Sequence, residues 1–296
     1  MTKSFFDKLK ITYKEDISLK NYNTYRINTI AKFLVFPNNI EELILILNHI
    51  KENNIKHLIL GNGSNIILSM EHYDGIIIKL DKLNNIIYKD NLVTAEAGCS
   101  LIKLSLDTIG KGFTGMEFSH GIPGAVGASV AMNAGAYNSD ISKILKEATI
   151  LTPDNEIIIM KNKELDFTYR DSFLKRNKEY IVLSATFELE KGNVDEMKNL
   201  LEERKKKRIA SQPLDMPSAG SVFRNPENMY SGELIEKANL KGFSINGAEV
   251  STKHANFIVN KGNATGKDII ELIEKIQKEI KEKNGVELKL EQIIVR

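Results

Sequence analysis

The 296-residue chain has no tryptophan, six prolines and one cysteine, and only 7% of its residues are aromatic. A lone cysteine, Cys99, cannot form an internal disulfide, which is typical of a reducing compartment. It stands between Gly98 and Ser100, so we interpret it as a small packing residue, with a redox role as the lesser alternative. His and Cys residues show no metal-ligand spacing, and we expect no metal site.

Long apolar runs are also missing. The most apolar stretches, such as Leu43–Leu47 and Ile76–Ile78, are far too short to span a bilayer. The first residues, MTKSFFDKLKITYKED, mix charges with aromatic side chains and lack the apolar core of a signal peptide. We therefore expect a soluble, cytoplasmic protein that does not act at a membrane.

Neither sign of charge is in excess: 41 Lys and Arg stand against 39 Asp and Glu. A net charge of +2 gives no general attraction to nucleic acid. One basic run, Arg204–Arg208, lies inside a predicted helix. It is interpreted either as a solvated helix surface or as an attraction for an anionic substrate. The length suggests two or three domains.

Caps and apolar spacing predict three helices. The first spans about 40–53, and the second runs from near Val194 to a point before Pro213. The third follows Thr265 and stops at Asn284-Gly285. Short strand-like runs bounded by turn residues are Lys32–Phe36, His57–Leu60, Gly75–Leu80, Leu92–Glu96, Ile157–Met160, Tyr180–Glu190 and His254–Val259. Without a regular βαβ alternation, these elements predict an α+β chain of several small domains.

The first glycine-rich segment, Gly61-Asn-Gly-Ser-Asn65, lies between a strand and an apolar run that is predicted to be another strand. Glycines allow backbone N–H groups to converge on an anion, and Ser64 and Asn65 add side-chain donors. It is no Rossmann fingerprint, because Ile66 occupies the third glycine position and no helix follows. A tight structural turn and a phosphate-binding nest both remain open.

The second glycine-rich segment spans Ser119–Tyr137, where small residues recur every three or four positions. On a helix this spacing leaves one face nearly bare, so another backbone or a flat ligand can approach closely. The interruption Gly-Ile-Pro-Gly and the ending Asn-Ala-Gly-Ala-Tyr are unusual for simple helix packing. Two such segments in one chain suggest a long diphosphate ligand, a dinucleotide.

Seven motifs occur in a fixed order along the chain: Asn23–Arg26, Leu60–Asn65, Gly121–Gly127, Met132–Tyr137, Tyr169–Ser172, Ala219–Pro226 and Glu291. Together they resemble the UDP-N-acetylenolpyruvoylglucosamine reductase (UDP-N-acetylmuramate dehydrogenase) family from about Lys20 to Ile294. The resemblance is to the compact form, which lacks an inserted loop whose tyrosine covers the substrate.

This resemblance implies an FAD-binding fold of the vanillyl-alcohol oxidase and p-cresol methylhydroxylase type, with two subdomains, followed by an α/β substrate domain. The implied boundaries are an N-terminal extension at 1–19, FAD subdomains at 20–81 and 82–190, and a substrate-binding domain at 191–296.

The resemblance also implies an activity. NADPH would reduce bound FAD, and the flavin would then reduce UDP-N-acetylglucosamine enolpyruvate to UDP-N-acetylmuramate, a precursor of peptidoglycan. The partner would be this small molecule alone, with no nucleic acid, and the protein would be a monomer. FAD contacts are expected at Arg26, Gly61, Asn62, Gly63, Ser64, Asn65, Gly121, Ile122, Pro123, Gly124, Ala125, Gly127, Asn133, Gly135 and Ala136. Substrate contacts are expected at Tyr169, Gln212, Arg224 and Asn225.

Three residues match the catalytic positions of the family. Arg170 would stabilise the enolate that forms when hydride adds beta to the carboxylate, since a guanidinium is always charged and offers paired donors. Ser221 would donate a proton to carbon, although by local sequence it is an ordinary turn serine. Glu291 would act as the second stabilising group, with Glu287 as the alternative register.

The chain departs from the family pattern at Ile27–Thr29, at Met70-Glu71 and at Ile293. At the last of these positions the family usually has an arginine that meets the UDP phosphates. Another basic residue must then meet the phosphates, and the candidates are Arg224, Lys206 and Arg296. Two other functions are weighed. Another flavin oxidase of the same fold would leave Ser221 and Glu291 without roles, and a non-catalytic nucleotide-binding module would carry no flavin.

Overall fold

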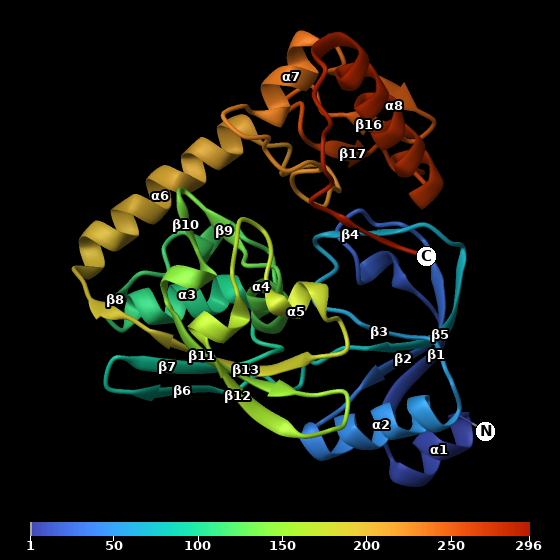
Figure 1. Ribbon diagram of the computed structural model, residues 1–296, viewed down its shortest axis with the longest axis vertical. Coiled ribbons are helices and arrows are strands. Elements are labelled where there is room, and N and C mark those ends of the chain that lie inside the picture. Colours follow the sequence, from blue (N-terminus) through green and yellow to red (C-terminus); the bar gives the residue numbers. More distant parts are fainter. Residues whose placement is uncertain (1) are drawn as a thin grey trace. The chain divides into compact units, whose positions relative to one another are not determined.

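The computed structural model describes residues 2–296, whose segments gather into two units (Figure 1). Unit 1 comprises the described residues up to Glu15, Phe33–Gly61 and Gly75–Arg204. Unit 2 comprises Asp16–Lys32, Asn62–Asp74 and Lys205–Arg296. Each unit therefore collects segments that are far apart in sequence, and the predicted four-part division at 19, 81 and 190 stays a prediction.

A four-stranded sheet in the order β1-β2-β5-β3 begins the fold. The chain enters through α1 (Thr2–Leu9), β1 (Thr12–Ser18), β2 (Ile30–Phe36), α2 (Ile40–Glu52), β3 (His57–Ile59) and β5 (His72–Ile78). Leu43 and Ile46 of α2 are fully buried and share a core with Ile76 and Ile78 of β5. Strands β3 and β5 are parallel, with Ile59 opposite Ile78, so the chain leaves both at the same edge.

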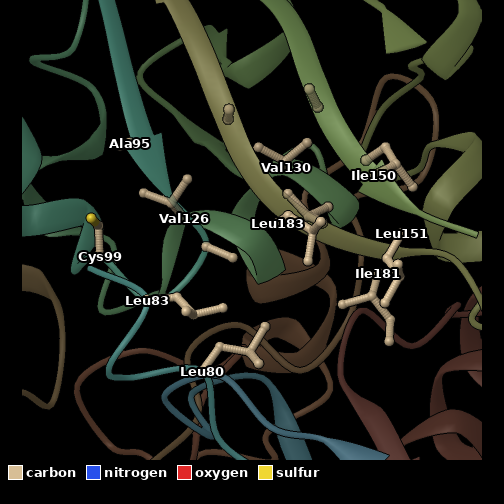
Figure 2. Close-up of a cluster of buried hydrophobic side chains, with 14 of the residues drawn as sticks. Leu80, Leu83, Ala95, Cys99, Val126, Val130, Ile150, Leu151, Ile181 and Leu183 are labelled. Atoms are coloured by element: carbon tan, nitrogen blue, oxygen red, sulfur yellow. The ribbon is translucent and has the colours of Figure 1, made fainter. Parts of the chain in front are cut away.

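A five-stranded antiparallel sheet in the order β12-β11-β13-β7-β6 adds to the unit 1 core. Its strands are β6 (Ile86–Lys89), β7 (Leu92–Glu96), β11 (Leu145–Leu151), β12 (Ile157–Lys161) and β13 (Ile181–Glu188). Helix α4 (Val126–Ala131) packs against β13. Figure 2 shows Val126 and Val130 of this helix beside Leu183 of β13. The sheet therefore packs against the helix of the second glycine-rich segment.

Shorter elements complete unit 1. They are α3 (Leu101–Gly110), α5 (Phe173–Arg176), the strand pair β8 (Phe113–Thr114) and β14 (Glu190–Lys191), and the pair β9 (Gly135–Ala136) and β10 (Ser139–Asp140). Helix α6 (Val194–Ser211) begins in unit 1 and continues into unit 2 from Lys205.

Unit 2 is built around one long helix, α8 (Gly266–Asn284) (Figure 1). It packs on α7 (Ser231–Lys237) and on strands β15 (Ser244–Ile245) and β16 (Ala248–Val250). Its buried stripe is Ile269, Leu272, Ile273, Ile276 and Ile280. The other elements are β4 (Ile66–Leu68), β17 (Ile258–Asn260) and β18 (Ile293–Val295). Strand β18 pairs in parallel with β4, Ile293 opposite Ile66.

The predicted α+β character is confirmed, and so are the three helices, which appear as α2, α6 and α8. The strand predicted at His254–Val259 is shorter, Ile258–Asn260. Its first residues form a turn instead, because the Ser251 hydroxyl accepts hydrogen bonds from the backbone N–H groups of Lys253 and His254. Within Ser119–Tyr137 only Val126–Ala131 is α-helical. No helix of residues 2–296 is long and apolar enough to cross a membrane.

The start of α8 provides a test of the fold. The Thr265 hydroxyl accepts a hydrogen bond from the N–H of Asp268, and the Asp268 carboxylate accepts one from the N–H of Thr265. Replacing Thr265 with Ala removes one of these bonds, and we expect it to lower the free energy of unfolding by about 1 kcal/mol. The exposed Glu274→Ala on the same helix is the control and should change little. Urea denaturation followed by circular dichroism compares the two.

Candidate functional site

The first glycine-rich turn has its carbonyl groups held by internal donors. The carbonyl of Gly61 accepts from the Lys79 ammonium at 2.7 Å. That of Gly63 accepts from the N–H of Thr24 at 3.1 Å, and that of Asn65 from the N–H of Ile293 at 2.9 Å. A turn that binds an anion must direct carbonyl oxygens away from it and N–H groups towards it. The residues therefore fit a phosphate-binding turn.

Gly63 is required by the fold itself. Its φ is +64°, and a Cβ at this position would lie 2.2 Å from the carbonyl oxygen of Tyr22. Any side chain would collide with the backbone of the Asn23–Arg26 motif. The structural-turn interpretation and the phosphate interpretation are thus compatible, because the fold demands the glycine whichever ligand the turn holds.

Lys79 contacts the first turn, although nothing in its local sequence marks it. It follows β5, at the edge where β3 also ends, and its side chain is 6% exposed. Its ammonium contacts the half-exposed Asp81 carboxylate at 3.2 Å as well as the Gly61 carbonyl. A buried charge is costly unless it is paired and hydrogen-bonded. Lys79 consequently holds the carbonyl of Gly61, the first residue of the turn, through a charged donor.

The second glycine-rich segment is approached by the chain's own backbone. The N–H groups of Val126 and Gly127 donate to the carbonyls of Cys99 and Ala97, each at 2.9 Å. A Cβ on Gly127 would lie 2.8 Å from the Cβ of Ala97. The bare face that the small residues predicted is therefore filled, in part, by residues 97–99.

Within unit 1, Gly61 of the first glycine-rich segment contacts the second segment. A Cβ placed on Gly61 would lie 3.1 Å from the Cβ of Ala128 and 3.6 Å from that of Ala125. Ala128 is exposed, and Gly121 and Ile122 before it are half-buried. The first residue of one segment thus lies directly against the helix of the other.

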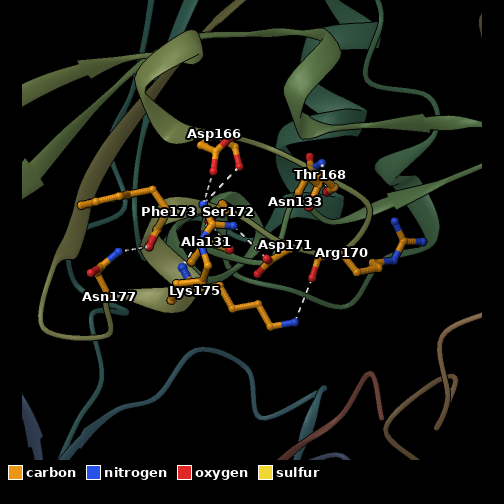
Figure 3. A network of polar contacts seen from close by, with 11 residues as sticks. Ala131, Asn133, Asp166, Thr168, Arg170, Asp171, Ser172, Phe173, Lys175 and Asn177 are labelled. Carbon is orange, nitrogen blue, oxygen red and sulfur yellow. Dashed lines mark hydrogen bonds and ion pairs between the residues drawn. The ribbon is translucent and has the colours of Figure 1, made fainter. Parts of the chain in front are cut away.

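The end of the second segment is joined to the Tyr169–Ser172 motif (Figure 3). The side-chain amide of Asn133 donates to the Thr168 carbonyl at 2.9 Å and accepts from the N–H of Ser142 at 3.0 Å. The buried Ser172 hydroxyl donates to the Ala131 carbonyl at 2.6 Å. Asn133 is therefore a residue that positions the motif as well as a predicted FAD contact.

Arg170 has its side chain turned to the predicted cofactor segment. Its guanidinium donates to the carbonyl of Gly135 and lies 5.0 Å from the ring centre of Tyr169, which is half-exposed. The neighbouring Asp171 pairs instead with Arg176 at 2.8 Å. Burial alone would raise the pKa of Asp171, but the hydrogen bond and charge of Arg176 outweigh it, and that pKa lies below its ordinary value. The structure thus gives Asp171 its own partner.

Backbone strain gathers at the motifs. Among residues 2–296, the non-glycine residues with positive φ are mostly Asn and Asp, which tolerate this conformation. The exceptions are Lys10, Arg26, Tyr137 and Arg170, with φ of 55°, 59°, 54° and 56°. The last three belong to motifs that carry the family resemblance. Such strain persists only where the surroundings hold it, and it is concentrated at functional sites.

Ser221 and Glu291 are brought together in unit 2. The N–H of Glu291 donates to the carbonyl of Val222 at 2.9 Å, and Phe223 and Leu290 form a β-bridge. The Asn65 side chain donates to the carbonyl of Glu291 at 3.2 Å, so the first turn, Glu291 and the Ser221 segment are contiguous. Glu291 is half-buried and Glu287 is exposed. Arg170 belongs to unit 1.

Four further predicted residues have these contacts. Arg26 is exposed and donates to the Asn21 side chain at 2.9 Å. The Gln212 side chain accepts from Arg208 at 3.1 Å. Asn225 accepts from the N–H of Ser231, the first residue of α7, at 3.1 Å. The N–H of Arg224 donates to the Lys289 carbonyl at 2.9 Å.

Two further residues were missed in the sequence. Asn256 and Gln292 are each 4% exposed and bind backbone groups on either side of Ser221. Asn256 lies in the turn closed by the N–H of Phe257 and the carbonyl of His254, but nothing local relates it to Ser221. A polar residue at an apolar position, such as Gln292 before the strand Ile293–Val295, was the only available signal.

The fold and the motifs agree with comparisons to known proteins. Residues 212–295 match the family model described as UDP-N-acetylenolpyruvoylglucosamine reductase, C-terminal domain, and residues 31–161 match an FAD binding domain model. A crystal structure of UDP-N-acetylenolpyruvylglucosamine reductase from Thermus caldophilus superposes with a TM-score of 0.81 at 28% identity, over 97% of this chain and 99% of that chain. The predicted FAD-binding fold with a C-terminal domain is confirmed.

Relatives named UDP-N-acetylenolpyruvoylglucosamine reductase match along the whole chain. The protein of Clostridium novyi is 43% identical over 292 residues, which cover 99% of this chain and 94% of that relative. The protein of Caldanaerobacter subterraneus is 43% identical over 300 residues, covering 100% of this chain and 99% of its own length. The chain therefore belongs to the UDP-N-acetylenolpyruvoylglucosamine reductase family.

Proposed function

We propose that this protein reduces UDP-N-acetylglucosamine enolpyruvate to UDP-N-acetylmuramate, with NADPH as reductant and FAD as cofactor. The observation that carries the proposal is the pairing of residues 289–291 with residues 222–224, which sets Glu291 beside the Ser221 segment. A flavin oxidase with another substrate would have no use for this pairing of a serine and a carboxylate. We further propose a monomer in the cytoplasm that acts on this small molecule in peptidoglycan precursor synthesis.

FAD would supply the hydride chemistry when bound, by accepting a hydride from NADPH and giving it to the substrate carbon. The turn Gly61–Asn65 would hold its diphosphate, because the carbonyls of Gly61, Gly63 and Asn65 are already turned to internal donors. Residues 121–127 and 133–136 would also line the cofactor, since Gly61 lies against Ala125 of this segment.

Arg170 would hold the carboxylate of the enolpyruvyl group. Hydride addition beta to that carboxylate moves negative charge onto its oxygens, and a fixed guanidinium stabilises the charge where it forms. The left-handed backbone of Arg170 and the hydrogen bond from the Lys175 ammonium to its carbonyl, at 2.8 Å, support a fixed position.

Ser221 would deliver the proton that ends the reaction. A serine hydroxyl is a weak acid, but the carbon that receives the proton is a strong base at that moment, so a positioned hydroxyl is sufficient. Glu291 would hydrogen-bond the enolic oxygen, and its half-buried position next to Val222 supports this role over the exposed Glu287.

Turnover of UDP-N-acetylglucosamine enolpyruvate with NADPH by the purified yellow protein tests the proposal directly. A protein that binds FAD and is reduced by NADPH, yet leaves this substrate unchanged, would be a different oxidoreductase of the same fold.

Ser221→Ala is expected to bind FAD and to be reduced by NADPH at the normal rate. Reoxidation by the enolpyruvyl substrate should slow by roughly 100- to 10,000-fold, the usual contribution of a positioned proton donor. Stopped-flow absorbance of the flavin separates the two half-reactions. Ser244→Ala, an exposed serine of the same unit, should behave as the unaltered protein. Normal reoxidation of Ser221→Ala contradicts the assigned role.

Arg170→Ala should lose the same half-reaction by roughly 100- to 1,000-fold, because one preorganised donor to the developing charge is removed. Arg176→Ala, which removes the guanidinium paired with Asp171 on the same loop, should retain the rate and lose at most about 1 kcal/mol of stability. If Arg170→Ala weakens only FAD binding, the arginine serves the cofactor and not the substrate.

Lys79→Met is expected to weaken FAD binding by about tenfold or more, since a hydrogen bond from a charged group contributes roughly 1.5–3 kcal/mol. Lys79→Arg should restore part of the affinity, because its guanidinium keeps the charge. Fluorescence titration of the apoprotein with FAD measures both, with the exposed Lys89→Met as control. Equal FAD affinity of Lys79→Met and the unaltered protein would show that the turn needs no cation at the Gly61 carbonyl.

A further inference from the structure

The backbone that leads into Ser221 is held by one side-chain amide. The NH₂ group of Gln292 donates to the carbonyl of Ala219 at 3.1 Å and to that of Gly220 at 3.2 Å. Gly220 itself has a φ of +76°, so the chain turns sharply directly before Ser221. Gln292 therefore binds both carbonyls of the turn that aims Ser221.

The orientation of this amide is fixed by Tyr25. The Tyr25 hydroxyl lies 3.0 Å from Oε1 of Gln292 and donates to it. Tyr25 is fully buried and Gln292 is 4% exposed. Burial raises the pKa of Tyr25 far above its ordinary value, more than the hydrogen bond to Gln292 lowers it, so the phenol keeps its proton at neutral pH. With Oε1 bound to Tyr25, the NH₂ group of Gln292 must face the two carbonyls.

The chain after Ser221 is also held by hydrogen bonds. The side chain of Asn256 accepts from the N–H of Phe223 at 3.0 Å and donates to its carbonyl at 2.8 Å. The N–H of Val222 donates to the carbonyl of Asn256 at 2.9 Å. Asn256 thus acts as a strand partner for the residues after Ser221, as Gln292 does for the two carbonyls before it.

Tyr25 is anchored in turn. Its carbonyl accepts from the Asn260 side chain at 2.7 Å, and Asn260 ends strand β17. A continuous, buried chain of hydrogen bonds consequently runs from β17 through Tyr25 and Gln292 to the turn at Gly220. Buried networks of this kind rigidify the groups that they bind.

We propose that Gln292, oriented by Tyr25, is a positioning residue that aims the Ser221 hydroxyl at the reacting carbon. The inference rests on the proposed role of Ser221 as proton donor. Gln292 touches neither substrate nor cofactor in this scheme, and it acts only through the two carbonyls. Loss of its NH₂ donors frees the turn, and a misplacement of about 1 Å at a reacting group costs on the order of 100-fold in rate.

The test compares Gln292→Met with the unaltered holoenzyme. Methionine has similar length and no charge, so it keeps the packing while it removes the hydrogen bonds to both carbonyls and the one from Tyr25. We expect reoxidation of the flavin by the enolpyruvyl substrate to slow by roughly 10- to 100-fold, with unchanged reduction by NADPH. Gln277→Met is the matched control, since Gln277 also binds a backbone carbonyl of unit 2, that of Leu288 at 2.8 Å. It should leave both half-reactions unchanged.

A double variant shows whether the effect passes through Ser221. If Gln292 acts by aiming the hydroxyl, Ser221→Ala/Gln292→Met reoxidises no more slowly than Ser221→Ala alone. Independent, multiplying losses would overturn the inference, and so would a normal rate for Gln292→Met beside a slow Ser221→Ala. A normal rate for Ser221→Ala would instead reject the proposed role of the serine.

Tyr25→Phe provides the same test if Gln292→Met fails to retain FAD. The phenylalanine keeps the ring and removes the hydroxyl that orients the amide. We expect a smaller slowing of reoxidation, roughly 3- to 10-fold, that again disappears in the Ser221→Ala background. A Tyr25→Phe variant with normal reoxidation would overturn the orientation by Tyr25.

Discussion

Residues 289–295 hydrogen-bond to two different partners, and the arrangement of unit 2 depends on this. Their first half pairs with residues 222–224, and their second half, as β18, pairs in parallel with β4. Glu291 lies where one partner gives way to the other, between Val222 and the Asn65 side chain. The backbone pairing thus sets Glu291 beside the segment that contains Ser221.

Buried polar side chains then set the fine geometry. Lys79, Asn256 and Gln292 are all buried, and each binds the backbone of a segment that carries predicted site residues. Burying such groups is unfavourable unless their hydrogen bonds are made, and the native arrangement alone makes them. These side chains thus hold their segments by hydrogen bonds although the segments contain no regular strand or helix.

The sequence predicted the elements whose signals are local. Helix α8 has its cap at Thr265 and a left-handed Gly285 at its end, and its apolar stripe is buried as the spacing required. The second glycine-rich segment was harder, because what approaches Gly127 is Ala97, about thirty residues earlier in the chain and invisible to local pattern. Family resemblance marked Arg170, Ser221 and Glu291 as candidate catalytic residues. It did not mark the residues whose side chains bind the backbone around them. Asn256 and Gln292 act over 33 and 72 residues and only on backbone atoms, so nothing in their neighbours reveals them.

The pairing of β4 with β18 has a consequence for biosynthesis. The contact between Asn65 and Glu291 spans 226 residues, so at about 5–20 residues per second the ribosome needs roughly 10–45 seconds to add the later partner. During this interval β4 has emerged, yet its parallel neighbour does not exist. The last segment of unit 1 ends at Arg204, so all residues of unit 1 are synthesised before β18. The nascent chain can therefore complete the unit that contains Arg170 while the unit that contains Ser221 still awaits its closing strand.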